Sequence, residues 1–580
     1  MSAKNEKALA ENNMKYFSIT FLAILFCVIA ISAQRELGVR PTETGGPLMF
    51  EQAAFDVQSY DVALKVDPKA KTIAGTTVMI AKVVIPTNVI VLDLDTPFTV
   101  ERIFSDARDT QSALKFERRE GKIWIWFSAT KQPGETFETI ITYSGSPREA
   151  PRPPWVGGTM WSKTPSGADW ISVALQNDGA DLLFPVKDHP SDKASTATMR
   201  VTVPDPLFAV GPGKLESTTK NNDGTSTYVW RMTNPIPNYS ILFDAAPYRV
   251  IKDTVKSVTG ETIPLELYIL PESYDKGAKL IAETKKYNAF FEKYLGPFPF
   301  RSQKLGIVET PHLGMEHSTH IAYGNKFQFA DDGFDWLMFH EFGHEWWSNL
   351  VTASDWRDFW IHEGFQSFMD TLYVEETKGK EAYLTAMKKR AKETRNMQPV
   401  APREPKISYE VYLQAPDFIK SDGDIYTKGA VVLHTLRYLI GDDAFFRSLR
   451  KMCYPTKEME RITDGRQTRL VNTDDFLAIA ERESGMKLGW FFEMYLRQPK
   501  LPTLVTSISE TPGGRQKVLS LRWETPNNMP FPMPIDVEID GKIHRLRTEG
   551  GTASAQFFDK TTVDPNGWVL KAAQLAPAMP

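Results

Sequence analysis

The segment Phe339 to Trp347, FHEFGHEWW, constrains this chain more than any other stretch. His340 and His344 are four residues apart, so on a helix their side chains share one face and can reach one ion. Glu341 is rotated by about 100 degrees around the helix and can border the open side of that ion. This is the H-E-x-x-H pattern of hydrolytic zinc sites. By itself it predicts a zinc hydrolase, and two histidines on an ordinary helix are the alternative.

A third ligand is needed, because a catalytic zinc ion takes three protein ligands and keeps one position open. The segment WIHEGF offers Glu363, with 18 residues between it and His344. That length allows a turn and a second helix packed antiparallel to the first. His362 competes for the role, although on a helix it points about 100 degrees away from Glu363. Six of the nine histidines fall within residues 312–362, which favours a metal site in this region.

The expected chemistry follows from the charges of this ligand set. Two neutral imidazoles and one carboxylate leave a zinc site with a net charge of about +1, which lowers the pKa of bound water. Glu341 can accept the proton of the attacking water and deliver it to the leaving amine. We therefore expect one zinc ion per chain and amide hydrolysis without a covalent intermediate.

The chain of 580 residues is too long for one core, and its pattern changes along its length. Short alternating or β-branched runs lie before about residue 250 and again after residue 501, with helical spacing between them. We expect a multidomain α+β protein with an N-terminal β-sandwich, a mainly helical catalytic domain and a small C-terminal β-sandwich. The expected ranges are 34–55 for a linker, 56–253, 254–500 and 501–580 for these three domains.

Residues 1–33 have the pattern of a targeting segment. Three lysines precede an apolar run over residues 17–33, which ends in small residues before Gln34. This resembles a secretory signal peptide cleaved after Ala33, and an uncleaved membrane anchor through residues 17–33 is the alternative. Either interpretation predicts an exported protein that is periplasmic, secreted or membrane-anchored, with its catalytic domain outside the cytoplasm.

Charge and cysteine content narrow the classes of partner and the residue types that can bind a metal. The formal net charge of -4 gives no case for nucleic-acid binding. Only Cys27 and Cys453 are present, and Cys27 lies in the apolar segment. The rest of the chain can therefore form no internal disulfide, and a metal site must use histidine and carboxylate ligands.

Two long segments, HEFGHEWWSNLVT and WRDFWIHEGFQSFMDTLY, resemble the zinc-binding stretch of the aminopeptidase-N-like peptidases, which belong to the gluzincins. The likeness covers nearly everything after residue 55. It implies a thermolysin-like catalytic domain with His340, His344 and Glu363 as zinc ligands and Glu341 as the general base. The long helical C-terminal domain common in the family has no counterpart here, so a more open site, or closure by another subunit of a homo-oligomer, is expected.

The segment LGMEHSTHIAYG is similar to the family's exopeptidase motif, usually Gly-x-Met-Glu-Asn. The resemblance implies that Gly314, Met315 and Glu316 bind substrate, with Glu316 holding the free α-ammonium group, for which a carboxylate is the suitable partner. Leu313 replaces the usual glycine and His317 the usual asparagine. We expect both departures to reshape the first subsite, with His317 among the substrate-binding residues.

Two further segments carry the resemblance. DIYTKGAVVLHTLR is similar to the stretch with the transition-state tyrosine, which implies that Tyr426 donates to the developing oxyanion. LQNDGADLLFPVKDHPSDK resembles a β-domain segment that reaches the cleft, which implies that Gln176 lines the amine pocket, although Asp181 stands where the family has arginine. Asp370 replaces a usual glutamate and either supports the zinc ligands or is a helix surface residue.

The leading hypothesis is an exported zinc aminopeptidase that acts on peptides with a free N-terminus. A zinc endopeptidase would share the metal residues and differ at Glu316. A catalytically inactive binding or adhesion module on the same scaffold is the alternative from another class, and Glu341 and Tyr426 argue against it.

Overall fold

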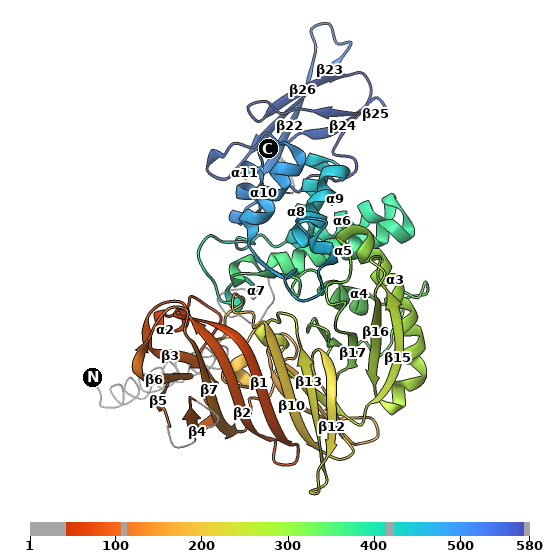
Figure 1. The fold of residues 1–580 in the computed structure, drawn as a ribbon. Helices are drawn as coiled ribbons and strands as arrows, with labels where there is room; N and C mark the ends of the chain where they lie inside the picture. Colours follow the sequence, from red (N-terminus) through yellow and green to blue (C-terminus); the bar gives the residue numbers. More distant parts are fainter. Residues whose placement is uncertain (1–41, 106–112, 413–422, 573–580) are drawn as a thin grey trace, which may run out of the picture.

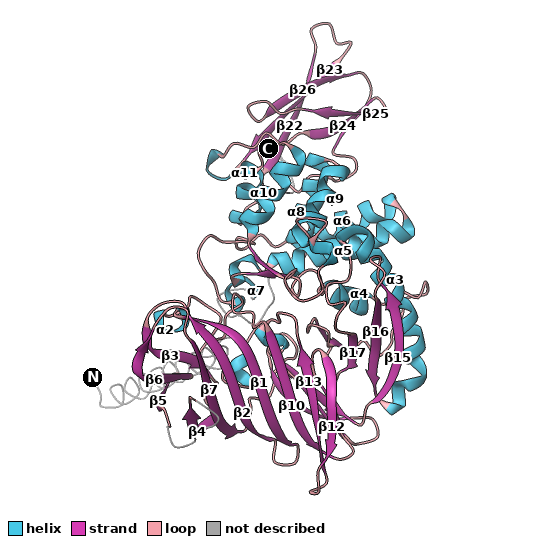
Figure 2. Cartoon of the chain, viewed as in Figure 1, coloured by secondary structure: helices cyan, strands magenta, loops and turns pink. Residues whose placement is uncertain are grey.

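The computed structural model describes residues 42–105, 113–412 and 423–572. The expected targeting segment, residues 1–33, lies outside the described residues. Three structural units follow one another along the chain, from β-sheets at the bottom of Figure 1 through a helical region to a small β unit at the top. Figure 2 shows the same change from strand to helix and back to strand. The multidomain α+β class expected from the sequence is confirmed.

The N-terminal unit contains a seven-stranded sheet in the order β12-β13-β10-β1-β2-β7-β4. A three-stranded sheet, β3-β6-β5, and a four-stranded sheet, β11-β14-β9-β8, complete it. The strands of the large sheet are β1 (Phe55–Asp67), β2 (Thr72–Val83), β4 (Phe98–Phe104), β7 (Thr136–Gly145), β10 (Thr196–Pro204), β12 (Lys214–Lys220) and β13 (Thr225–Met232). The others are β3 (Thr87–Asp93), β5 (Lys115–Arg119), β6 (Lys122–Lys131), β8 (Gly158–Lys163), β9 (Asp169–Ala174), β11 (Phe208–Val210) and β14 (Asp244–Ala246).

Buried and exposed side chains alternate along these strands, as in β1. In β1, Val62, Leu64 and Val66 are buried while the residues between them are less so, because successive side chains point to opposite faces. The antiparallel pairing of β1 with β2 places Leu64 opposite Gly75. A Cβ at position 75 would lie 2.5 Å from the Tyr143 ring. Glycine at this position therefore leaves room for the buried tyrosine.

The stretch expected to be a linker is packed where the structure describes it. The short helix α2 (Phe50–Ala53) lies against β3, and the buried Gln52 donates a 2.8 Å hydrogen bond to Asp93. The backbone N–H of Gly45 donates to the carbonyl of Asp188. These contacts hold the described part of the stretch against the β unit.

The catalytic unit begins with a five-stranded sheet in the order β15-β16-β17-β19-β18. Its strands are β15 (Arg249–Lys256), β16 (Thr262–Ile269), β17 (Leu305–Glu309), β18 (Gly314–Met315) and β19 (Ile321–Tyr323). The expected boundary between residues 253 and 254 cuts through β15. Because β15 pairs with β16 over its whole length, the boundary lies before Arg249.

Helices make up most of the remaining catalytic unit, and α3 runs beside the β15–β16 pair in Figure 1. They are α3 (Gly277–Leu295), α4 (Trp336–Gly343), α5 (Trp360–Lys378), α6 (Lys380–Glu393), α7 (Ser408–Tyr412), α8 (Thr427–Ile440), α9 (Asp442–Cys453), α10 (Thr473–Ser484) and α11 (Gly489–Phe492). A short pair, β20 (Val351–Ala353) and β21 (Arg469–Val471), joins the loops between them. Among the described residues, no helix combines the length and apolar character needed to cross a membrane.

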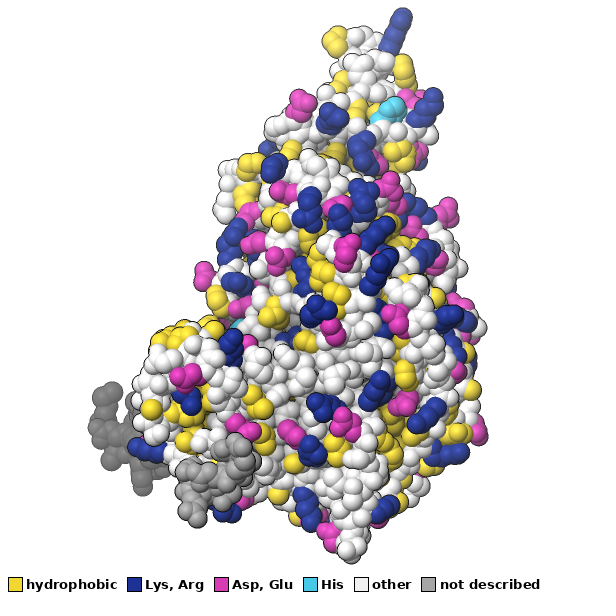
Figure 3. Space-filling view, in the orientation of Figure 1, with side chains coloured by type: hydrophobic (Ala, Val, Ile, Leu, Met, Phe, Trp, Pro, Cys, Tyr) yellow, Lys and Arg dark blue, Asp and Glu magenta, His cyan; other side chains and the backbone are white. Residues whose placement is uncertain are grey.

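The C-terminal unit consists of two three-stranded sheets, β22-β23-β26 and β25-β24-β27. Their strands are β22 (Thr503–Glu510), β23 (Lys517–Glu524), β24 (Ile535–Ile539), β25 (Lys542–Leu546), β26 (Thr552–Phe557) and β27 (Thr561–Val563). Trp568 stacks on His434 of α8 with ring centroids 4.5 Å apart, which ties this unit to the helices. On the face shown in Figure 3, acidic and basic side chains are interspersed over all three units.

Candidate active site

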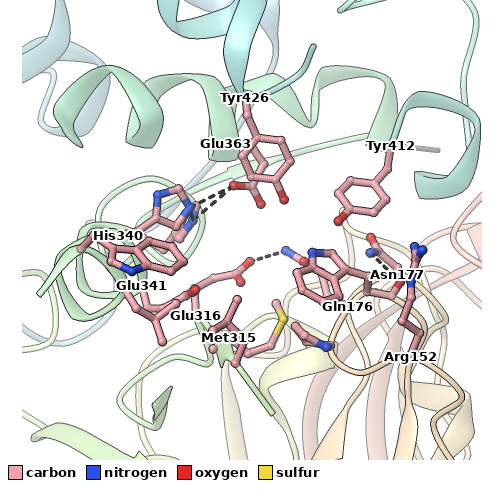
Figure 4. Close-up of a pocket in the computed structure, with 17 residues that line it drawn as sticks. Arg152, Gln176, Asn177, Met315, Glu316, His340, Glu341, Glu363, Tyr412 and Tyr426 are labelled. Carbon is pink, nitrogen blue, oxygen red and sulfur yellow. Dashed lines mark hydrogen bonds and ion pairs between the residues drawn. The ribbon is translucent and has the colours of Figure 1, made fainter. Parts of the chain in front are cut away.

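A cavity of about 440 Å³ lies between the N-terminal β unit and the catalytic helices. Nine of the ten site residues expected from the sequence line it, and they come from segments that are far apart in the chain. Figure 4 shows these side chains converging on the cavity from the ribbons of both units. The nine residues are Gln176, Gly314, Met315, Glu316, His340, Glu341, His344, Glu363 and Tyr426.

His340, His344 and Glu363 form a tight triangle. The two Nε2 atoms are 3.3 Å apart, and Glu363 Oε2 lies 3.5 Å from that of His340 and 3.4 Å from that of His344. Ligand atoms placed tetrahedrally at about 2.0–2.1 Å from one zinc ion are separated by about 3.4 Å. Glu363 Oε2 is also buried without a hydrogen-bond donor. The donor set and its spacing therefore fit a zinc ion.

Hydrogen bonds at the far side of each imidazole fix this orientation. His340 Nδ1 lies 2.9 Å from Asp370 Oδ2, and His344 Nδ1 lies 2.8 Å from the carbonyl oxygen of Trp347. Both partners accept the Nδ1 proton, so each Nε2 is left free to act as a ligand. Asp370 in turn accepts a 3.0 Å hydrogen bond from Gln366. Asp370 therefore supports a candidate metal ligand and is not merely a helix surface residue.

The ligands are carried by α4 and α5, and α4 is shorter than the helical pattern predicts. It ends at Gly343, and His344 keeps a helical backbone as the C-cap residue. Beyond it the backbone N–H groups of Asn349 and Leu350 bond to carbonyls five residues earlier. At Gly343 a Cβ would lie 1.9 Å from Gln366 Oε1, so this glycine lets α4 and α5 approach closely.

The site is crowded with buried carboxylates, which shift the ionisation of the imidazoles. Burial acts to lower the pKa of His344, but Glu363 and Glu316 raise it to about 9. Burial also acts to lower the pKa of His340, yet Asp370 raises it well above its usual value. The surrounding carboxylates therefore stabilise positive charge at the two imidazoles. A dication bound by the triangle would supply that charge in place of protons.

Glu341 lies beside this triangle and is buried. Burial raises its pKa to about 8, against the lowering effect of His340 and His344. The strand β18 comes very close to its carboxylate, because a Cβ on Gly314 would lie 2.7 Å from Glu341 Oε1. A buried carboxylate with a raised pKa is suited to accept and release a proton near neutral pH.

Glu316 occupies a second acidic position in the cavity. Gln176 Nε2 donates to its Oε1, and the hydroxyl of Tyr239 donates to the same oxygen over 3.2 Å. Its backbone carbonyl accepts from Asn349 Nδ2. Burial raises the pKa of Glu316, while the nearby His344 acts to lower it. The carboxylate lines the cavity and can bind a positively charged group of a ligand there.

Tyr426 lies beside the triangle on the cavity wall. Its ring stacks on the His340 ring with centroids 6.3 Å apart, and Figure 4 shows its hydroxyl next to Glu363 and directed into the cavity. It immediately precedes α8, and the ring of Tyr412 packs edge-on against it at 6.1 Å. A phenol in this position can donate a hydrogen bond to a substrate oxygen.

Two histidines near the motifs point elsewhere. His317, expected among the substrate-binding residues, does not line the cavity, because the chain turns after Glu316 and its fully buried ring faces His320. His362 accepts a 2.9 Å hydrogen bond from the backbone N–H of Ala353, so its ring is committed to β20 and does not join the triangle.

Several lining residues were not anticipated. Trp336 was the most accessible to sequence reasoning, because it lies four residues before His340 and so on the same face of α4. Leu337 follows it. Trp155, Asn177 and Tyr412 come from loops and a short helix, and no local pattern marks them.

Comparison with protein-family models matches residues 57–240 to the peptidase M1 N-terminal domain and residues 272–495 to the peptidase family M1 domain. Human glutamyl aminopeptidase is 25% identical over 431 residues, which cover 70% of this chain and 42% of that protein. Probable aminopeptidase 1 of Saccharolobus solfataricus is 24% identical over 378 residues, which cover 62% and 44%. The chain thus spans less than half the length of these relatives.

Solved structures share the fold. The M1 zinc metallopeptidase of Deinococcus radiodurans bound to a Tyr-Ser-Ala substrate has a TM-score of 0.63 and 22% identity, with coverage of 80% of this chain and 98% of that one. Legionella pneumophila aminopeptidase A in complex with aspartic acid has a TM-score of 0.70 and 16% identity, with coverage of 90% and 60%.

Proposed function

Because the chain belongs to peptidase family M1, we propose that it is a zinc-dependent aminopeptidase that hydrolyses the first peptide bond of substrates with a free N-terminus. The observation that carries this proposal is the buried Glu316 carboxylate, which shares one cavity with the His340, His344 and Glu363 triangle. An anionic site at that position accounts for recognition of an α-ammonium group. Export of the protein, expected from residues 1–33, is part of the same proposal.

Beside the three metal-ligand candidates, Glu316, Glu341 and Tyr426 each have a role in the reaction. Glu316, oriented by Gln176, binds the substrate ammonium group and places the first carbonyl near the triangle. His340, His344 and Glu363 would hold a zinc ion, which would supply a Lewis acid for that carbonyl and a lowered pKa for bound water. Glu341 accepts a proton from the attacking water and then delivers it to the leaving amine. Tyr426 donates a hydrogen bond to the carbonyl oxygen as negative charge develops there.

The first experiment separates this proposal from an endopeptidase. Matched peptides with free and acetylated N-termini are incubated with the zinc-loaded protein, and products are identified by mass spectrometry. We expect release of the first residue from the free peptide and no cleavage of the acetylated one, and a chelator should abolish the activity. Equal cleavage of both peptides would contradict an aminopeptidase.

A second experiment tests the role of Glu341. The variant Glu341→Gln should retain zinc, measured by elemental analysis, because the residue is not part of the triangle. Its kcat should fall by about 10²–10⁴-fold, the usual contribution of a general base. Wild-type turnover in this variant would refute Glu341 as the general base, whereas the inactive binding module predicts no turnover even in the wild type.

A further inference from the structure

Trp336 is the most exposed of the aromatic residues that line this cavity. It is the first residue of α4, it lines the cavity, and its side chain is 50% exposed. By contrast, Trp346 and Trp347 at the other end of the same segment are fully buried. A tryptophan offers about 150–250 Å² of surface for burial, so one left open on a cavity wall is a strong site for an apolar ligand group.

The position of Trp336 is fixed by the start of α4. Asp335 is the N-cap residue, and its side chain accepts from the backbone N–H of Met338 over 3.1 Å. The same carboxylate accepts from Asn325 Nδ2 over 2.9 Å and from the Tyr323 hydroxyl. Because Asp335 is held at several points, the start of α4 is fixed, and the Cα of Trp336 has a defined position at the cavity.

The order of groups along the cavity places Trp336 on the side where the substrate residues after the scissile bond would lie. It lies one helical turn before His340, so its side chain follows the metal-binding face of α4 away from His344. In Figure 4 His340 and Glu341 lie on one side of Glu316, and Gln176 lies on the other. A peptide with its ammonium group at Glu316 and Gln176 therefore continues past the triangle toward the beginning of α4.

Two apolar residues of the same region line the cavity together with Trp336. Leu337 and Leu313 line the same cavity, and Leu337 Cδ1 would lie 2.7 Å from a Cβ on Gly314, which places it directly beside β18. Glu316 and Glu341 also line the cavity, and their carboxylates disfavour an acidic side chain there. A large apolar or aromatic side chain suits this wall best.

We propose that Trp336, with Leu313 and Leu337, forms the subsite for the residue that follows the scissile bond, so that peptides with a large apolar or aromatic second residue are preferred. This inference rests on the proposed aminopeptidase function and adds the class of substrate to it. Trp336 acts through contact with the substrate side chain and takes no part in the proton transfers.

The test uses tripeptides with the same first residue and phenylalanine, alanine or aspartate in second place. For the wild type, kcat/KM for the phenylalanine peptide should exceed that for the alanine peptide by on the order of tenfold, and the aspartate peptide should be poorest. In Trp336→Ala the phenylalanine-to-alanine ratio should fall to about one, whereas Trp336→Phe should keep most of it.

Two controls make the result specific. An amino-acid amide, which has no second side chain, should be hydrolysed by Trp336→Ala within about twofold of the wild-type rate, because the metal and ammonium sites are intact. The matched variant Trp155→Ala removes another partly exposed cavity tryptophan, from the β unit, and should leave the second-residue ratio unchanged.

The outcomes separate the two proposals. A wild-type ratio near one, or a ratio that Trp336→Ala does not alter, overturns the subsite while N-terminal cleavage still supports the proposed function. Equal cleavage of free and acetylated peptides overturns the aminopeptidase proposal, and the subsite for a second residue is refuted with it.

Discussion

The contact between Gly364 and Gly429 offers a direct test of how the fold positions the site. Gly364 follows the ligand Glu363 in α5, and Gly429 lies three residues after Tyr426 in α8. A Cβ on Gly429 would lie only 2.8 Å from the Cα of Gly364. The two helices therefore touch through bare backbone at the point where each carries a catalytic-site side chain.

The variant Gly429→Ala should push these helices apart. Carbon atoms in contact prefer a separation of about 3.5–4.0 Å, so the helices must move by roughly 1 Å. Overpacking of this kind costs about 1–3 kcal/mol, of which the better helix propensity of alanine returns about 1 kcal/mol. The stability loss is therefore expected to be at most about 2 kcal/mol, and the folded state should persist.

The effect on catalysis should be larger than the effect on stability. A displacement of about 1 Å between Glu363 and Tyr426 disturbs the geometry at the reacting carbonyl, and such misplacement can lower a rate by about 10²-fold. The assay is kcat/KM for an amino-acid amide, with zinc content and thermal unfolding measured on the same samples. We expect a loss of about 10–100-fold in kcat/KM while the melting temperature changes by a few degrees.

The matched control is Gly489→Ala. Gly489 begins α11, and no atom lies within 4 Å of the position of its Cβ, so this variant adds the same methyl group without a clash. It should keep wild-type activity. If Gly429→Ala also keeps wild-type kcat/KM and stability, the helix contact does not set the distance between Glu363 and Tyr426, and the reasoning is refuted.

Two further predictions concern Tyr239 and His434. The Tyr239 hydroxyl lies 3.2 Å from Glu316 Oε1 and 2.7 Å from Ser348 Oγ, so Tyr239→Phe should lower kcat/KM for free peptides by about 10–100-fold, because a hydrogen bond to a charged group contributes about 1.5–3 kcal/mol; unchanged kinetics with normal zinc content would contradict this role. Burial lowers the pKa of His434 to about 3, so below about pH 6.5 the unfolded chain binds a proton that the folded chain does not, and the free energy of unfolding should fall with decreasing pH by up to about 1.4 kcal/mol per pH unit. Urea unfolding of the wild type and His434→Gln between pH 7 and 5 should show a shallower pH dependence in the variant, and equal slopes would refute it.

The metal triangle could be predicted because it depends on local order. His340 and His344 are separated by one helical turn, so the period of a single helix brings them together. Spacing offered both His362 and Glu363 on the next helix, and the choice of Glu363 came from the resemblance. The end of α4 at Gly343 was not visible in the pattern, since the apolar residues after it, including Trp346, continue the helical spacing although the backbone turns.

The rest of the site could not be derived from local patterns. Gln176 and Glu316 are 140 residues apart, and only the packing of the β unit on the catalytic unit makes them hydrogen-bond partners. Tyr239 lies in a short 3-10 turn with no periodicity, so nothing in the sequence marks it as a neighbour of Glu316. His317 was misplaced because a position beside a motif says little about side-chain direction where a strand ends in a turn.

The metal triangle and the ammonium site should respond differently to a movement between the units. The triangle is held by α4 and α5 within one unit, whereas the ammonium site joins Glu316 to Gln176 and Tyr239 across the boundary between two units. A small shift of the β unit therefore separates the donors from Glu316 while the distances among His340, His344 and Glu363 stay the same. Perturbation of that boundary should weaken recognition of the N-terminus before it weakens metal binding, since interfaces between units move more readily than the packed core within one.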